Sequence, residues 1–314
     1  MADTTRLGLG CAPIGNLYSA VTDTQAADTV DAAWEHGIRL FDTAPLYGYG
    51  LSERRLGDAL RDRPRDEFTI ATKVGRRLDA IDNHSDSTGP AHQDSIFADT
   101  PAMWPQFDYS RDGILRSIDD SLERLGLDHL DIVHVHDPDD HIEVAMNEAF
   151  PTLIELRDSG VIGAVGCGMN NTAPLLHFVE RVDLDVILLA GRYSLLDPSG
   201  GDELLPACAA RGVDVIIGGV FNSGLLADPD ANTTFDYAAA PAALVERVRN
   251  LRSICESFGV TLPMAAVGFA LRNPAVSSVL VGARSRSEVI ADVAAADADL
   301  PPDLWQALEI GCLT

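Results

Sequence analysis

Short apolar runs rich in β-branched residues alternate with longer amphipathic segments along this chain of 314 residues. Such alternation is typical of repeated strand and helix units around a parallel sheet, because strands buried on both faces read as short continuous apolar runs. This pattern constrains the fold more strongly than any other feature of the sequence. The expected strands cover residues 6–11, 39–43, 69–74, 132–136, 163–168, 186–189, 213–218 and 278–281.

Helices are expected in the segments between these strands. Residues 24–36 follow the cap candidates Thr22 and Asp23 and end at Gly37, and residues 111–125 end at Gly126. Both are ordinary signals for the ends of helices. The other expected helices cover residues 52–60, 145–157, 202–211, 242–258, 263–272 and 287–296.

Eight strands with intervening helices, no linker and no break in composition predict one α/β domain over residues 1–314, a single closed (β/α)8 TIM barrel. A doubly wound open sheet is the alternative. With 46% apolar residues, the chain can bury the core that either fold needs. In a barrel of this kind the active site lies at the C-terminal ends of the strands.

Residues 76–110 interrupt the alternation, since they show no clear periodicity and hold the aromatic residues Phe97, Trp104, Phe107 and Tyr109. A loop of this length inside a compact domain is usually either a functional lid or disordered. Aromatic residues make up only 6% of the chain and are concentrated in this loop. We therefore expect residues 76–110 to form a lid over the active site.

The charge balance excludes several classes of partner. The chain has 23 basic and 48 acidic residues, a formal charge of −25, which would repel nucleic acid and anionic lipid. The longest apolar runs are too short to span a membrane, and the N-terminus shows no secretory signal. We expect a cytoplasmic protein without a nucleic acid or membrane partner. Five scattered cysteines without a C-x-x-C pair predict buried free thiols and no metal site.

Lys73 is the only lysine in the chain. Arginine can replace lysine wherever only surface charge is needed, but it presents a planar fork in place of a compact ammonium and does not give up its proton. A single lysine kept in the strand-like run 69–75 therefore points to a function for this side chain. Its alternative explanation is a compositional bias against lysine.

Four polar side chains are expected to meet at the ends of neighbouring strands: Asp42, Tyr47, Lys73 and His136. A nearby ammonium favours the phenolate of a tyrosine and brings its pKa closer to working pH. The carboxylate of Asp42 could hold Lys73 charged, while the imidazole of His136 bonds a substrate oxygen. The set is suited to proton transfer at a carbonyl or alcohol oxygen.

Each of these residues also has an alternative structural role. Asp42 could cap the turn that follows it, Tyr47 could be a loop aromatic, and His134 or His136 could lie in the core. Their coincidence at three consecutive strand ends favours the functional interpretation.

The segments FDTAPLYG (41–48), ATK (71–73) and DIVHVHDP (131–138) resemble the three signature regions of the aldo-keto reductase superfamily. The resemblance runs along nearly the whole chain and agrees with the barrel of that superfamily. It implies that Tyr47 is the general acid or base, that Lys73 and Asp42 tune it, and that His136 orients the carbonyl. The spacing from Asp131 to Pro138 in this motif selects His136 over His134.

Three further segments, 8–18, 136–141 and 218–224, resemble the bacterial branch of L-fucose, D-threo-aldose and D-arabinose 1-dehydrogenases and pyridoxal 4-dehydrogenase. The resemblance implies hydride transfer between nicotinamide and an aldehyde or the C1 atom of an aldose. The expected partner is therefore a small carbonyl, alcohol or sugar.

The G-x-G at Gly8 and Gly10 lacks the third glycine and the acidic partner of a Rossmann site, so we reject that fold. The resemblance implies instead an NAD or NADP lying over the strand ends. The residues that would contact it are Gly168, Met169, Asn170, Gly219, Val220, Phe221, Asn222, Ser223, Gly282, Arg284, Glu288 and Asp292.

Some of these positions depart from the superfamily pattern. Gly168-Met169, Ala190 and Gly218 stand where Ser-Asn, Gln and an aromatic residue are frequent, with Asn170 and Phe221 as possible substitutes. Arg284, assisted by Arg286, could pair with the 2′-phosphate of NADP. Two carboxylates nearby, Glu288 and Asp292, disfavour a further phosphate, so NAD is the favoured cofactor.

Two rival functions follow from the same residues. A cofactor-binding redox sensor with little turnover would keep the cofactor contacts, but His136 favours an enzyme over the regulatory members of the superfamily. A Schiff-base aldolase would use Lys73 as a nucleophile. The proximity expected for Asp42 argues against a neutral amine.

Overall fold

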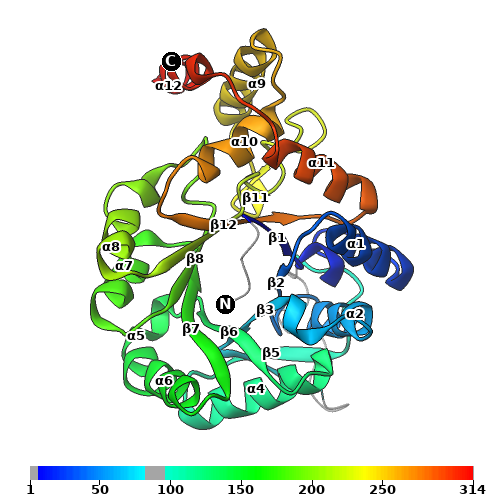
Figure 1. Ribbon diagram of the computed structural model, residues 1–314, viewed down its shortest axis with the longest axis vertical. Coiled ribbons are helices and arrows are strands. Elements are labelled where there is room, and N and C mark those ends of the chain that lie inside the picture. The colour runs from blue at the N-terminus through cyan, green and yellow to red at the C-terminus, as the bar shows by residue number, and fades with distance from the viewer. Residues whose placement is uncertain (1–5, 82–95, 314) are drawn as a thin grey trace.

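The computed structural model describes residues 6–81 and 96–313 of the chain. Eight parallel strands close into a barrel (Figure 1). The strands follow one another around the barrel in chain order: β1 (Leu7–Gly10), β2 (Leu40–Asp42), β3 (Thr69–Val74), β6 (Leu130–His136), β7 (Ile162–Met169), β8 (Val186–Ala190), β9 (Asp214–Gly218) and β12 (Val276–Gly282).

The closed sheet confirms the predicted barrel and excludes the open alternative. Leu9 on β1 is paired with Phe41 on β2 and with Val281 on β12, so the first and last strands are neighbours. All eight predicted strands are present, and their ends shift by only a few residues.

Helices surround the barrel (Figure 1), and they include all eight that the sequence predicts. The sequence missed α5, α7 and α12, although Leu175, Phe178 and Val179 on α7 show the spacing of a buried helix face. The helices of the described residues are α1 (Asp23–Glu35), α2 (Leu51–Leu60), α4 (Arg111–Leu125), α5 (Ile142–Val144), α6 (Phe150–Asp158), α7 (Thr172–Arg181), α8 (Leu204–Arg211), α9 (Ala242–Ser257), α10 (Leu262–Leu271), α11 (Arg286–Ala296) and α12 (Pro302–Leu313). A π-helical turn, Ala145–Ala149, joins α5 to α6.

Helices α9, α10 and α12 project to one side of the barrel around a core cluster of their own (Figure 1). Within the described ranges, no single helix has the length and apolar character needed to cross a membrane; α9 and α10 meet that test only as a pair bent by 91°. Four cysteines, Cys11, Cys167, Cys208 and Cys255, are buried free thiols as predicted, and the side chain of Cys312 lies outside the described part.

Two separate apolar layers result from the alternation along each strand. Side chains such as Val133 and Val135 on β6 point outward and join the main core between strands and helices. A smaller cluster that includes Leu40, Leu188 and Leu280 fills the inside of the barrel. Because side chains alternate, the last inward position of each strand faces the barrel mouth.

The inward positions at the mouth fall into two groups. On β2, β3 and β6 they carry the polar side chains of Asp42, Lys73 and His136. On the other five strands they carry only glycine or alanine: Gly10, Gly168, Ala190, Gly218 and Gly282. One side of the mouth is therefore polar, and the opposite side is lined with hydrogen atoms or methyl groups.

The described ends of the expected lid are regular structure. Strands β4 (Arg76–Ala80) and β5 (Met103–Phe107) form an antiparallel pair, which the sequence did not predict. Phe97 packs near Tyr47, with ring centroids 6.1 Å apart, and Leu17 forms a β-bridge with Phe97. Residues 82–95 of the expected lid lie outside the described residues.

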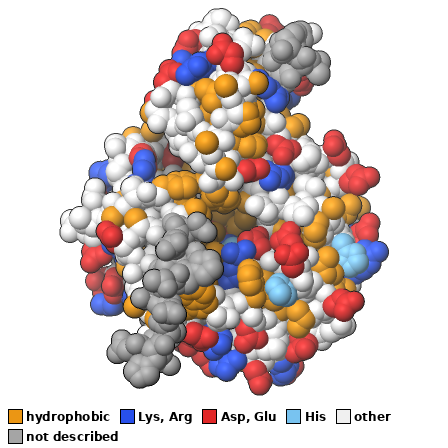
Figure 2. All heavy atoms as spheres, turned by 180° about the vertical axis from the view of Figure 1, so that it is seen from behind, with side chains coloured by type: hydrophobic (Ala, Val, Ile, Leu, Met, Phe, Trp, Pro, Cys, Tyr) orange, Lys and Arg blue, Asp and Glu red, His pale blue; other side chains and the backbone are white. Residues whose placement is uncertain are grey.

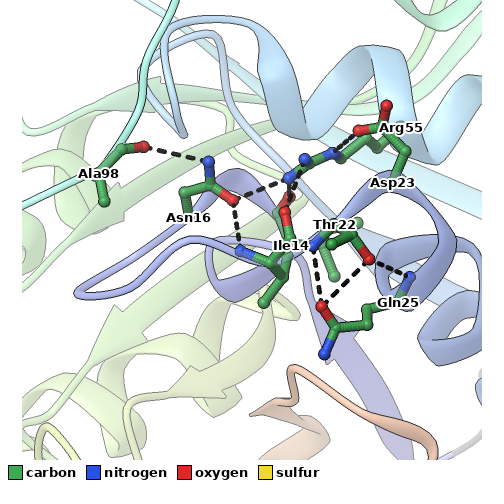
Figure 3. A network of polar contacts seen from close by, with 8 residues as sticks. Ile14, Asn16, Thr22, Asp23, Gln25, Arg55 and Ala98 are labelled. Atoms are coloured by element: carbon green, nitrogen blue, oxygen red, sulfur yellow. Dashed lines mark hydrogen bonds and ion pairs between the residues drawn. The ribbon is translucent and has the colours of Figure 1, made fainter.

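A polar network fixes the loop between β1 and α1 (Figure 3). The guanidinium of Arg55 on α2 donates to the carbonyl of Ile14, to the side-chain oxygen of Asn16 and to Asp23. Asn16 also donates to the carbonyl of Ala98. The network therefore joins this loop to α2 and to the segment beside Tyr47.

The same loop supports the turn that carries Tyr47. Gly48 has φ +61°, and a Cβ atom there would lie 2.2 Å from the carbonyl oxygen of Gly15. Only glycine satisfies both the backbone angle and this close approach.

A buried ion pair connects α2 and α4 to the strand that holds Lys73. Glu53 on α2 is fully buried, accepts from Thr72 Oγ1 at 2.7 Å, and pairs with Arg124 Nε of α4 at 2.6 Å. Thr72 precedes Lys73 on β3 but points to the outer layer. Removing one partner of such a pair leaves an uncompensated buried charge.

We expect Arg124→Met to lower the free energy of unfolding by about 3 kcal/mol, because the Glu53 carboxylate would stay buried without its partner. The measurement is urea unfolding followed by circular dichroism. Arg116→Met, on the same helix with a side chain that is 55% exposed, is the control and should change the value by less than about 1 kcal/mol. Equal effects of the two substitutions would contradict the prediction.

Candidate active site at the barrel mouth

Lys73 lies at the centre of the polar side of the mouth, with a side chain that is 1% exposed. Its ammonium donates to both carboxylate oxygens of Asp42, at 2.7 and 2.9 Å, and to the carbonyl of Thr43 at 2.8 Å. Burial alone lowers the pKa of Lys73, but the charge and hydrogen bonding of Asp42 outweigh it, so the pKa is raised. The amine is therefore charged, which excludes it as the nucleophile of a Schiff-base aldolase.

Tyr47 lies above this ion pair. The Lys73 Nζ atom is 4.5 Å from the centre of the Tyr47 ring, and the Tyr47 ring meets the His136 ring edge to face at 6.1 Å. The structure thus brings together all four residues that the sequence placed at the strand ends.

The expected lowering of the Tyr47 pKa is wrong in its net direction. Burial raises the pKa of Tyr47 and exceeds the opposing effect of the Lys73 ammonium. The sequence pattern indicated the Lys73 ammonium beside Tyr47, but it did not indicate how deeply the Tyr47 hydroxyl is buried. A raised pKa keeps the phenol protonated at neutral pH, as a proton donor requires.

His136 is neutral at physiological pH. Burial lowers its pKa well below the ordinary value, and the cations Arg76 and Lys73 add to this effect. The Nδ1 atom is buried without a hydrogen-bond partner among the described residues. A neutral imidazole keeps one N–H, with which it can donate to a carbonyl oxygen.

His134 lies one layer below, inside the barrel. Both of its ring nitrogens are buried without partners in the described part of the chain, and a Cβ atom on Gly166 would lie 2.2 Å from its Nδ1. Burial lowers the pKa of His134 to about 3, with a further contribution from Lys73.

The small residues opposite leave space for a flat ring. A Cβ atom on Gly168 would make only ordinary contacts, 3.7 Å from Leu188 and 3.8 Å from Lys73, and one on Gly218 would lie 3.5 Å from Leu188. Neither glycine is required by packing or by its backbone angle, so each contributes room.

The expected cofactor residues lie at the ends of β7 and β12 and in the segments that follow β7, β9 and β12, but their side chains point in different directions. Met169 and Val220 are buried in the outer core, so only their main chains can face the mouth, whereas Asn170 is exposed. Asn222 is buried, donates to the carbonyl of Gly191, and leaves its Oδ1 without a partner among the described residues. Among the residues predicted for the cofactor, Asn222 is thus the one with a buried, unused polar atom.

At the expected adenosine end of the cofactor site, the arginines are paired with carboxylates of the protein. Glu288 accepts from the main-chain N–H of Arg284 at 2.7 Å and pairs with its guanidinium at 3.3 Å. Arg286 binds two carboxylates of α1, Asp28 and Glu35. Burial, with the charge of Glu288, raises the pKa of Asp292 to about 7. The predicted helper role of Arg286 therefore has no support in its contacts.

Three residues beside His136 were not predicted as site residues, although Tyr109 was among the aromatic residues of the expected lid. Arg76 pairs with Asp137 at 2.6 Å, and the Tyr109 hydroxyl donates to the carbonyls of His136 and Asp137 at 2.7 and 2.9 Å. Asp137 stands inside a recognisable motif, but Arg76 and Tyr109 reach it from distant positions, and the sequence did not indicate these contacts. Among the described residues, no group of three or more side chains could hold a metal ion.

Seen from the side opposite to Figure 1, the surface is hollowed near the middle of the barrel. Apolar side chains line the hollow, and acidic, basic and histidine side chains gather beside it (Figure 2). This distribution agrees with a site for a small molecule that carries polar groups on an apolar frame.

Comparisons with known proteins agree with this geometry. The family model of the Aldo/keto reductase family matches residues 6–310. The chain is 40% identical to a D-threo-aldose 1-dehydrogenase of a Pseudomonas species, over 96% of this chain and 92% of the relative. It is 42% identical to a pyridoxal 4-dehydrogenase of Microbacterium luteolum, over 97% and 93%.

A solved structure with the same fold is an aldo-keto reductase from Bacillus halodurans in its holo form. It superimposes with a TM-score of 0.75 at 27% identity, covering 98% of this chain and 91% of the other. These findings give no support to the alternative of a redox sensor without turnover.

The buried His134 predicts how stability depends on pH. A histidine whose pKa falls from about 6.5 in the unfolded chain to about 3 in the fold binds its proton only when unfolded, so stability is lost as pH falls below about 6.5. Between pH 6 and 4.5 we expect the wild type to lose stability more steeply than His134→Leu, by about 1.4 kcal/mol per pH unit. Urea unfolding at several pH values measures this difference.

The control is His36→Leu, at an exposed position on the outside of the barrel. Parallel pH profiles of the wild type and His134→Leu would show that burial of His134 carries no such penalty.

Proposed function

We propose that this oxidoreductase, which belongs to the aldo/keto reductase family, oxidises or reduces the C1 position of an aldose or a related aldehyde. The observation that carries the proposal is the cluster of Tyr47, Lys73, Asp42 and His136 at one side of an open mouth. The names of the relatives, an aldose and a pyridoxal dehydrogenase, support a small carbonyl or cyclic hemiacetal as substrate.

Aldo-keto reductases use NAD(P)H, and the mouth fits a nicotinamide. Gly168 and Gly218 leave a flat space, and the unused Oδ1 of Asn222 is an acceptor of the kind that a carboxamide N–H needs. Gly219 and Ser223 would hold the pyrophosphate, with Gly282, Arg284 and Glu288 at the adenosine. The bound nicotinamide supplies or accepts the hydride.

In this proposal Tyr47 moves the proton. In reduction, its hydroxyl protonates the substrate oxygen as negative charge develops there, and in oxidation the phenolate takes the proton of the anomeric hydroxyl. The Lys73 ammonium stabilises the phenolate, because it stays charged within 4.5 Å of the ring. Asp42 holds the ammonium in place and keeps it protonated.

The neutral His136 binds and orients the substrate oxygen. With its hydrogen on Nε2, the imidazole can donate to the oxygen that Tyr47 protonates. A protonated imidazole would compete as an acid, and burial together with Arg76 and Lys73 disfavours that form.

We further propose that the protein prefers NAD to NADP. Glu288 occupies both the main-chain N–H and the guanidinium of Arg284, which would otherwise be free for a 2′-phosphate. Asp28 and Glu35 hold Arg286 in the same way. An additional phosphate would meet the carboxylate of Glu288.

We expect Tyr47→Phe to lower kcat by about 1,000-fold or more, because the phenyl ring keeps its packing but has no proton to transfer. Turnover is followed as absorbance of reduced nicotinamide with a panel of L-fucose, D-arabinose, L-galactose and pyridoxal, and cofactor affinity by fluorescence titration should be retained. Tyr49→Phe, a buried tyrosine of the same loop, is the control. Near-normal turnover in purified Tyr47→Phe would refute the assigned role.

We expect Glu288→Gln to shift the ratio of kcat/KM for NAD over NADP towards NADP by about tenfold, since removal of one carboxylate charge frees Arg284 for a phosphate. Steady-state kinetics with both cofactors measures the ratio. Glu180→Gln removes a similarly exposed glutamate that is also paired with an arginine, Arg181 at the end of α7, and should leave the ratio unchanged. A ratio that does not move in Glu288→Gln would contradict the assignment.

A further inference from the structure

Two charged side chains beside His136 have no part in the proton transfer. The carboxylate of Asp137 lies 3.7 Å from His136 Nε2 and 2.6 Å from a terminal nitrogen of Arg76. Arg76 begins β4, directly after the strand that carries Lys73, and Asp137 follows β6. The pair therefore lies beside the nitrogen that would bind the substrate oxygen.

The pair is held in place from behind. The Tyr109 hydroxyl donates to the carbonyls of His136 and Asp137, and the Asp137 N–H donates to the carbonyl of Gly168 at 3.0 Å. The ring of Phe107 lies against the Arg76 guanidinium at 5.1 Å. Asp137 takes the left-handed region, with φ +43°, which aspartate and asparagine tolerate better than most residues. This support fixes the direction of both side chains.

Hydrogen-bonding capacity remains on both partners. The Nε atom of Arg76 is buried and finds no partner within the described residues. Asp137 uses one carboxylate oxygen for Arg76, and its side chain is 26% exposed. A partly exposed carboxylate, paired with a guanidinium, thus stands beside His136.

A purely structural role does not account for this arrangement. Partly exposed ion pairs contribute only about 0–1 kcal/mol to stability. Burial raises the pKa of Asp137 against the effect of Arg76, so placing a carboxylate there is unfavourable. The positive charge of Arg76 also lowers the pKa of His136. A hydroxyl group, which both donates and accepts, is the ligand that satisfies an Arg–Asp pair.

We infer that Arg76 and Asp137 bind a hydroxyl group on the carbon next to the reacting carbon, so that the enzyme selects 2-hydroxy aldehydes and their cyclic sugar forms. This inference rests on the proposed function, in which His136 binds the oxygen of the reacting carbon. Because the charges of the pair cancel, the substrate it favours is a neutral sugar, and a sugar phosphate would gain no net attraction. The two residues act on specificity, and the proton transfer remains with Tyr47.

The test compares two aldehydes that differ by one hydroxyl, lactaldehyde and propanal, with NADH as reductant. In the wild type we expect kcat/KM to be at least about 30-fold higher for lactaldehyde, since a hydrogen bond to a charged group contributes this much. Asp137→Asn and Arg76→Gln should lose about 30-fold on lactaldehyde but less than about threefold on propanal.

Matched controls are available on the same elements. Arg77 is the next residue on β4, is also 23% exposed, and pairs with Asp79 and Asp108. Asp140 lies exposed in the turn after Asp137. Arg77→Gln and Asp140→Asn should leave both rate constants unchanged. Equal losses on the two aldehydes in Asp137→Asn, or a wild type that does not discriminate, would overturn the inference.

A binding measurement separates this inference from the proposed function. Tyr47→Phe loaded with NADH is titrated with lactaldehyde and propanal by saturation-transfer NMR, which needs no turnover. Lactaldehyde should bind more tightly than propanal, and the difference should vanish when Asp137→Asn is added. If binding discriminates as expected while the wild type reduces neither aldehyde, the proposed function fails and the hydroxyl site stands; if binding does not discriminate, the inference fails whatever the turnover.

Discussion

The buried ammonium of Lys73 is the constraint on which the rest of the site depends. A cation that is 1% exposed needs all its hydrogens bonded, and here they go to both oxygens of Asp42 and to the carbonyl of Thr43. These acceptors lie at the end of β2, so the ion pair fixes the register of two neighbouring strands at the mouth. It also fixes the start of the loop that returns to place the Tyr47 ring over the nitrogen.

The inward positions at the barrel mouth form two sides, one with polar side chains and one with glycine or alanine. The last inward position carries a charged or polar side chain on three strands and glycine or alanine on the five others. On the side with the small residues, Asn222 lies in the loop after β9, where it donates to the carbonyl of Gly191 and keeps its Oδ1 without a partner among the described residues. In the proposed function, the nicotinamide would lie on this side and the substrate oxygen at Tyr47 and His136.

Charge around the mouth is balanced locally, although the whole chain carries a formal −25. Arg76 is neutralised by Asp137, Arg284 by Glu288, and Arg286 by Asp28 and Glu35. Free cations that would attract phosphate are thus absent from these described positions. The same feature favours a cofactor without a 2′-phosphate and a substrate without a phosphate, which connects the two proposals through one electrostatic cause.

The sequence by itself determined the barrel and the four residues at its mouth, because strand alternation has a period of two and strand ends are local features of the chain. It also contained the motif around Asp137 without indicating its partner. Tertiary structure alone decided that Arg76 meets Asp137 across 61 positions and that Glu53 meets Arg124 across 71. It also decided that the pKa of Tyr47 is raised, since the effect of burial outweighs that of the neighbouring Lys73 ammonium. Pairings between distant residues and the depth of a side chain depend on how the elements pack, and no local pattern encodes them.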